Sequence, residues 1–222
     1  MISRSAFTFS VLLFLSFSLI NAQEVKINNN FVIESDGTPR LDNSATVFDD
    51  LRFDALSIKL SGSSGIAVNL TENTVDFATG ADINDYLIAS PQMPHALKFQ
   101  TKIYPHIHFF QAMNAVPNFA IQYRWQSNSL SKTTAWTALK CNTAVFTYTG
   151  GTILQIATTT DGITPPVDQK ISDICQFRVI RDTKNGLGLS FGADPYNATA
   201  GVLSFDCHFE IDTQGSRTQY AK

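Results

Sequence analysis

The sequence has few charged residues and lacks any cluster of positive charge. Asp, Glu, Lys and Arg make up only 16% of its 222 residues, and the formal net charge at pH 7 is -3. Lysine and arginine are scattered along the chain, which argues against nucleic acid as a partner. Aromatic residues reach 11%. The composition therefore predicts a well-filled core, or a surface that other subunits partly cover.

Long hydrophobic runs are also scarce, with one exception at the amino terminus. The apolar segment 6–20 follows Arg4 and leads to the small residue Ala22, which is the pattern of a cleaved secretory signal peptide. At about 15 residues it is shorter than the roughly 20 that a membrane-spanning helix needs. We expect residues 1–22 to be removed, the mature chain to begin at Gln23, and the product to be secreted, outside the cell or on its surface, without membrane insertion. An uncleaved anchor or a lipoprotein is the alternative, and the absence of a cysteine after the apolar segment disfavours it.

Cysteine is rare as well. Cys141, Cys175 and Cys207 have spacings that fit no zinc ribbon and no redox pair. Export permits a disulfide, and three cysteines allow three different single bridges. Cys175 and Cys207 are in phase with apolar neighbours, so buried free thiols agree with the sequence at least as well as a bridge does. The sequence leaves the pairing open.

Helical periodicity is nearly absent, whereas alternation of apolar and polar residues recurs throughout the mature chain. The most regular segments are 97–103, 119–126, 175–181 and 203–211. Such alternation is typical of antiparallel strands with one buried face. We therefore predict an all-β protein, with residues 45–222 forming a single antiparallel β-sandwich or jelly-roll-like domain.

The last segment shows the alternation most clearly. The residues expected to face the core are Leu203, Phe205, Cys207, Phe209 and Ile211. Those expected on the opposite face are Ser204, Asp206, His208, Glu210 and Asp212. Tight hairpins are predicted at Gly150-Gly151 and Asn185-Gly186, where these residue types tolerate positive φ. Residues 61–65 and 158–166 are predicted loops.

The stretch 23–44 precedes this domain and has a different pattern. Its apolar residues are Val25, Ile27, Phe31 and Ile33, and the polar run 28–30 separates them into two pairs. A flexible, partly apolar segment of this kind can add as a strand to an open sheet edge of a neighbouring copy. The alternative is an ordinary first strand, or a loose tail, of its own domain.

Four residues are candidates for a metal site. They are His106 and His108, two apart on a predicted strand, and His208 and Glu210 on the last strand. Side chains two apart on a strand share a face, and imidazole with carboxylate is a common zinc ligand set. In cupin-type jelly rolls a similar His pair opens the metal motif, but the Glu that should follow is missing here. We favour hydrogen-bonding groups on a polar sheet face and expect no cofactor, with a cupin-like metal-dependent enzyme as an alternative.

No signature of nucleophilic catalysis is present, so we do not favour an enzyme. A carbohydrate-binding module is a further alternative, with Trp125, Trp136 and Tyr148 as exposed contacts for a glycan. Asn69 and Asn197 open two N-x-T sequons. These are candidate glycosylation sites on the surface.

The order of several short motifs resembles a group of phage and prophage virion structural proteins. The motifs lie at 48–52, 105–109, 121–123, 178–182 and 205–216, and the group carries a "pHiHw" strand and a closing "fdiHy..Dt.GS" strand in a β-rich domain. The resemblance covers residues 45–222. It places His106, His108 and His208 at the group's histidine positions and implies self-assembly without catalysis.

Two features depart from that group. Phe109 stands where the group has Trp, and virion proteins assemble in the cytoplasm and need no signal peptide. Combining the resemblance with export, we expect an extracellular structural protein that joins with copies of itself into a filament, sheath or surface coat.

Overall fold

The structure is a computed structural model that describes residues 24–127, 131–143, 148, 150–159 and 161–215. These residues form strands and two single turns of 3-10 helix, Asn43–Ala45 and Ala55–Ser57, which confirms the all-β prediction. The strands are β1 Val25–Ile27, β2 Phe31–Ile33, β3 Pro39–Leu41, β4 Val47–Asp54, β5 Lys59–Leu60, β6 Ile66–Asn69, β7 Thr74–Phe77, β8 Tyr86–Ala89, β9 Tyr104–Gln111, β10 Phe119–Gln126, β11 Thr137–Thr143, β12 Ile153–Thr159, β13 Ile174–Arg181 and β14 Ala200–Ile211. Among them no helix is long and apolar enough to cross a membrane.

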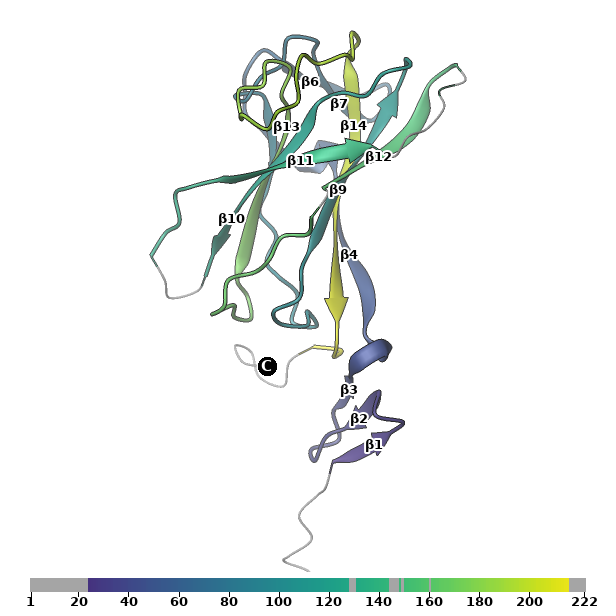
Figure 1. The fold of residues 1–222 in the computed structure, drawn as a ribbon, viewed down its shortest axis with the longest axis vertical. Helices are drawn as coiled ribbons and strands as arrows, with labels where there is room; N and C mark the ends of the chain where they lie inside the picture. The colour runs from purple at the N-terminus through teal and green to yellow at the C-terminus, as the bar shows by residue number, and fades with distance from the viewer. Residues whose placement is uncertain (1–23, 128–130, 144–147, 149, 160, 216–222) are drawn as a thin grey trace, which may run out of the picture.

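The larger sheet folds into two antiparallel layers (Figure 1). One layer has the order β4-β14-β9-β12, and the other has the order β8-β13-β10-β11. Strand β11 joins the two layers, because its first half pairs with β10 and its last three residues pair with β12. The short strands β5, β6 and β7 extend the outer edges. The result is a sandwich that is nearly closed along one side.

Phenylalanine side chains fill the space between the layers. Phe177 of β13 lies 5.0 Å from Phe205 of β14, and Phe109 of β9 lies 5.1 Å from Phe119 of β10, measured between ring centroids. Edge-on and tilted ring pairs at this spacing add to the free energy gained by burying their area. These contacts connect the two layers, so the alternation in the sequence correctly identified the inward face of β10 and β13.

Strand β14 departs from the prediction in two respects, its alternation at one position and its exposure at another. The register with β9 shifts between Val202 and Ser204, a β-bulge that moves Leu203 out of the core and brings Val202 into it. Asp206 was predicted on an open polar face, yet only 5% of it is exposed. The prediction was wrong there because β14 has neighbours on both edges and side chains from β9 cover its outer face.

Two other predicted elements are different in the structure. Residues 97–103 do not form a strand, because Gln100 has a φ of 63° and the chain turns there. Their apolar residues instead anchor a loop, with Leu97 and Ile103 buried and bridged to Ile211 and Ile163. Asn185-Gly186 forms a turn inside the long β13–β14 connection rather than a hairpin, because β13 and β14 lie in different layers. Part of the predicted hairpin strand before Gly150 lies outside the described residues.

A buried arginine holds the long β13–β14 connection against the sandwich. Arg181 is fully buried, and its Nε donates to Oδ2 of Asp194 at 2.8 Å. Its two terminal nitrogens donate to backbone carbonyls from two segments of the chain. These carbonyls belong to Phe77, Ala78, Tyr196 and Ala198. The guanidinium therefore ties the end of β7 and residues 194–198 to the end of β13.

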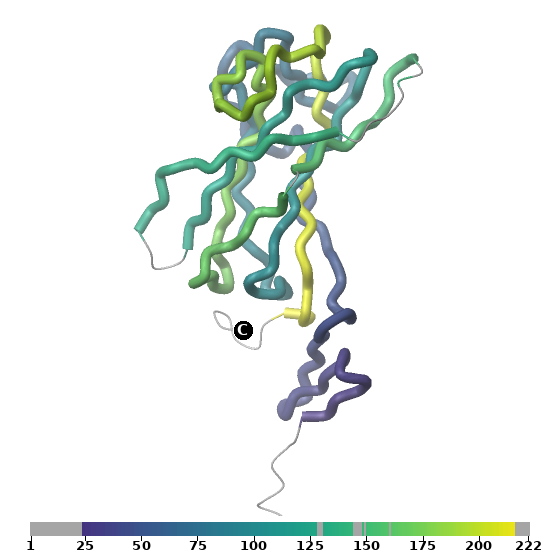
Figure 2. The backbone as a smooth tube through the Cα atoms, viewed as in Figure 1, coloured from purple at the N-terminus to yellow at the C-terminus, as the bar shows by residue number. Residues whose placement is uncertain are grey.

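The amino-terminal strands β1, β2 and β3 form a separate small sheet at one end of the sandwich (Figure 2). Asn28 and Asn29 have φ values of 53° and 58°, as a type I′ hairpin turn requires, and Asn tolerates this left-handed conformation. The polar run therefore makes a tight turn where we had predicted a flexible link. We call this three-stranded sheet, Val25–Leu41, the amino-terminal meander.

All three cysteines are free and buried. Burial raises the pKa of each thiol, and the neighbouring Cys207 raises that of Cys175 further. The open question of disulfide pairing is thus answered, in this structure, by three separate thiols.

Replacing Arg181 by Met should lower the free energy of unfolding by about 3 to 5 kcal/mol, because the buried carboxylate of Asp194 is left without its counter-charge. Arg124→Met is the matched control. Arg124 is half-exposed on β10, so its loss should cost less than about 1 kcal/mol. Urea unfolding measures both changes, and equal losses would show that Arg181 is not an anchor.

The buried thiols should make the protein less stable in alkali. Their pKa values are raised in the folded state, so their contribution is complete below the unfolded value of about 8.5 and is lost as the pH rises above it. Cys141→Ala should flatten the fall in unfolding free energy above that pH by up to about 1.4 kcal/mol per pH unit. Urea titrations at several pH values test this, and an unchanged slope would contradict it.

Candidate functional site

The pairing of β9 with β14 brings a histidine pair and a carboxylate together on the outer face of the first layer. Asp206 lies directly opposite His106 in the register, and Ser204 lies opposite His108. Directly opposed residues of antiparallel strands point to the same face. The prediction that His106 and His108 share a face is therefore confirmed, and β14 is their neighbour as a joint site requires.

The three side chains are in close contact. Asp206 Oδ2 lies 2.9 Å from Nε2 of His108 and 3.5 Å from Nε2 of His106. The side chains of His106 and Asp206 are each 7% exposed, and that of His108 is 21% exposed. We call these three residues the His-Asp triad. The sequence-based candidates did not include Asp206, although its position two residues before His208 indicated a shared face.

The charges of the triad depend on opposing effects. Burial by itself raises the pKa of Asp206, but a hydrogen bond with His106 and the nearby imidazoles outweigh it, so the pKa is lowered overall. Burial lowers the pKa of His108, although Asp206 opposes this change. At neutral pH we therefore expect an ionised Asp206 beside a neutral His108.

The other two metal candidates have separate environments. The ring of His208 lies 4.5 Å from that of His106, but its Nε2 lies 2.8 Å from Oδ1 of Asp50 on β4. Glu210 is not part of the cluster, because its Oε2 accepts a hydrogen bond from Nζ of Lys98 at 3.1 Å. The four candidate residues therefore do not meet at one point, since only His106 and His108 share a cluster with a carboxylate. The carboxylate beside the histidine pair belongs to Asp206 and not to the candidate Glu210.

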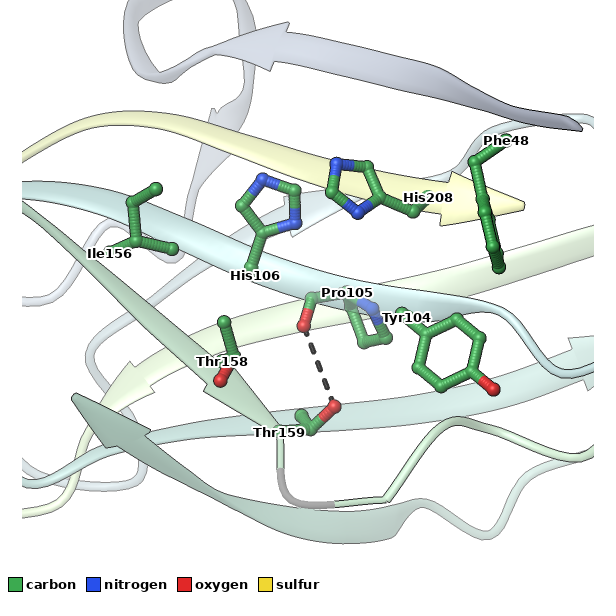
Figure 3. Close-up of a pocket in the computed structure, with 8 residues that line it drawn as sticks. All are labelled: Phe48, Tyr104, Pro105, His106, Ile156, Thr158, Thr159 and His208. Atoms are coloured by element: carbon green, nitrogen blue, oxygen red, sulfur yellow. Dashed lines mark hydrogen bonds between the residues drawn. The ribbon is translucent and has the colours of Figure 1, made fainter. Parts of the chain in front are cut away.

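A hollow of about 450 Å³ lies beside the triad (Figure 3). His106 and His208 line it together with the apolar side chains of Phe48, Tyr104 and Ile156. The rings of Phe48 and Tyr104 meet edge to face, with 6.0 Å between centroids. The outer face therefore places buried ionisable groups next to an apolar, solvent-open surface.

The three aromatic residues expected to contact a glycan do not form a common platform. Trp125 packs against the core, and Trp136 has the guanidinium groups of Arg124 and Arg178 over its ring at 4.3 and 4.1 Å. The hydroxyl of Tyr148 donates to the carbonyl oxygens of neighbouring backbone. The arrangement therefore does not favour stacking of a sugar on these rings.

The two sequon asparagines also differ from each other. Asn197 is exposed in the loop before β14, as a glycan acceptor must be. The Nδ2 of Asn69 donates to Oδ2 of Asp76 at 2.9 Å, and its Oδ1 accepts from two backbone amides. Asn197 is therefore the more accessible of the two.

No protein-family model and no curated protein matches the sequence.

Proposed function

We propose that this protein is an exported structural protein whose copies join into a filament or surface coat, and that its sandwich is a jelly roll. The strand order supports the fold. Numbered along the chain, β4 and β8 to β14 become strands one to eight, so the layers have the orders 1-8-3-6 and 2-7-4-5. Two Greek keys in succession produce this order. Jelly rolls of this kind form viral capsids, which agrees with the resemblance to virion proteins.

One observation carries the proposed assembly, namely the two-sided character of the amino-terminal meander. In its register Val25 lies opposite Ile33, and Ile27 lies opposite Phe31. All four apolar residues therefore share one face. Val25 and Ile27 are 52% and 50% exposed, so the projecting sheet presents a partly uncovered apolar surface.

The opposite face of the meander carries Lys26, Arg40 and the fully buried Val32, and its arginine is paired with acidic neighbours. Nε of Arg40 donates to Oδ1 of Asp42 at 2.8 Å, and Nη1 of Arg40 also contacts Glu34. The hydrogen bond with Arg40 lowers the pKa of Asp42. This network stabilises the meander as a unit, so we propose that it docks through its apolar face rather than donating a single opened strand.

We propose that the meander docks on the outer face of a neighbouring copy. The exposed side chains there are Phe48, Tyr104, Leu154 and Ile156. A contact between two different surfaces of the same chain is heterologous, and it extends into a filament unless its rotation closes a ring. The two apolar surfaces are complementary in character, and both would lose contact with water on assembly.

Changing Val25 and Ile27 together to Ser should abolish assembly while leaving the sandwich folded, because both side chains lie on the apolar face of the meander. Negative-stain microscopy and light scattering of the secreted protein should show filaments or large oligomers in the wild type and monomers in the double variant. Lys26→Ser, on the opposite face, should assemble as the wild type does.

The partner surface needs its own variant. Ile156→Asp should also produce monomers, since it places a charge on the proposed docking face. The proposal fails if the wild-type protein is monomeric at high concentration, or if the Val25 and Ile27 double variant still assembles.

A further inference from the structure

We propose that the His-Asp triad binds a divalent first-row transition-metal ion, for which Zn²⁺ is the probe. This inference goes beyond the proposed assembly and does not depend on it. His106, His108 and Asp206 would supply two imidazole nitrogens and one carboxylate.

The separations of the ligand atoms fit a shared ion. The two Nε2 atoms lie 2.9 and 3.5 Å from Asp206 Oδ2, and one potential ligand atom from each residue lies within 4.8 Å of the others. Ligands about 2.0 to 2.1 Å from a tetrahedral zinc are roughly 3.4 Å apart. Small side-chain rotations would therefore bring all three onto one ion.

Unsatisfied polar atoms beside the triad are a second, independent observation. Oδ1 of Asp206 and Oγ of Ser204 are buried without a hydrogen-bond partner among the described residues. Buried polar atoms usually have partners. An ion held by both oxygens of Asp206 would satisfy Oδ1. Since Ser204 lies opposite His108, a water on that ion would offer a partner to its hydroxyl.

A hydrogen-bonded triad without metal is the competing explanation. Without a metal, both histidines would contact Oδ2 of Asp206, and its Oδ1 would stay buried without a hydrogen-bond partner.

The surroundings indicate an open site. His106 lines the hollow beside Phe48, Tyr104 and Ile156, and a zinc site with three protein residues keeps a position for water or a substrate by expanding to five ligands. His208 lies next to His106, but its contact with Asp50 holds its Nε2. A small ligand entering the hollow would therefore reach the ion without displacing a protein side chain.

The test uses the mature protein after dialysis against a chelator. Calorimetric titration with Zn²⁺ should show one site per chain, and Co²⁺ should give the visible absorption of a tetrahedral complex. His108→Ala and Asp206→Asn should each weaken Zn²⁺ binding by about 100-fold or more. His95→Ala and Glu210→Gln are the controls, because His95 contacts Ser172 and Glu210 contacts Lys98 instead of the triad. Both controls should bind as the wild type does.

Circular dichroism checks that each variant is folded, and His108→Ala, at a partly exposed position, stands in for Asp206→Asn if the latter unfolds. No stoichiometric binding by the wild-type protein would overturn the proposal. So would binding that survives in His108→Ala, or that Glu210→Gln weakens equally. Loss of assembly in the meander variants with Zn²⁺ binding intact would separate this site from the proposed function.

Discussion

The buried guanidinium of Arg181 is the interaction on which the rest of the sandwich depends. A fully buried arginine requires a partner for every donor group, and here the partners are Asp194 and four backbone carbonyls. Those carbonyls lie at the end of β7 and in the loop that leads directly into β14. Holding that loop fixes where β14 begins at Ala200. The register of β14 against β7 and β9 follows from that starting point.

The register in turn creates the site. Antiparallel pairing places Asp206 opposite His106, although one hundred residues separate them in the sequence. A slip of one residue would turn Asp206 toward the core and Phe205 toward the solvent. The bulge between Val202 and Ser204 allows the upper part of β14 to pair with β7 while its lower part keeps the phase that the histidines need. The core and the triad therefore depend on the same register.

Much of this fold follows from the sequence, because a two-residue period is a local property. The alternation in 119–126 and 175–181 correctly predicted β10 and β13. It failed at 97–103, where Leu97 and Ile103 anchor a turned loop rather than a strand, since apolar spacing alone does not reveal a left-handed Gln100. It placed Asp206 on the correct face but did not reveal that this face is covered, because the burial of an outer face depends on which strands lie alongside it. For the same reason the sequence offered Glu210, and not Asp206, as a candidate carboxylate beside the histidines.

On a solvent-facing sheet, polar side chains are usually exposed and apolar ones are covered. The outer face of β4-β14-β9-β12 has the opposite arrangement. Phe48 is 59% exposed and Leu154 is 52% exposed, while His106 and Asp206 are 5% exposed. Exposed apolar side chains add little to folding, because they stay in contact with water. Buried ionisable groups oppose folding unless they are paired. Stability of the isolated chain therefore does not account for the exposed apolar side chains, and the mutual pairing of the triad leaves Oδ1 of Asp206 without a partner. In the two proposals, contact with another surface would cover the apolar half, and a bound cation would satisfy the buried polar half.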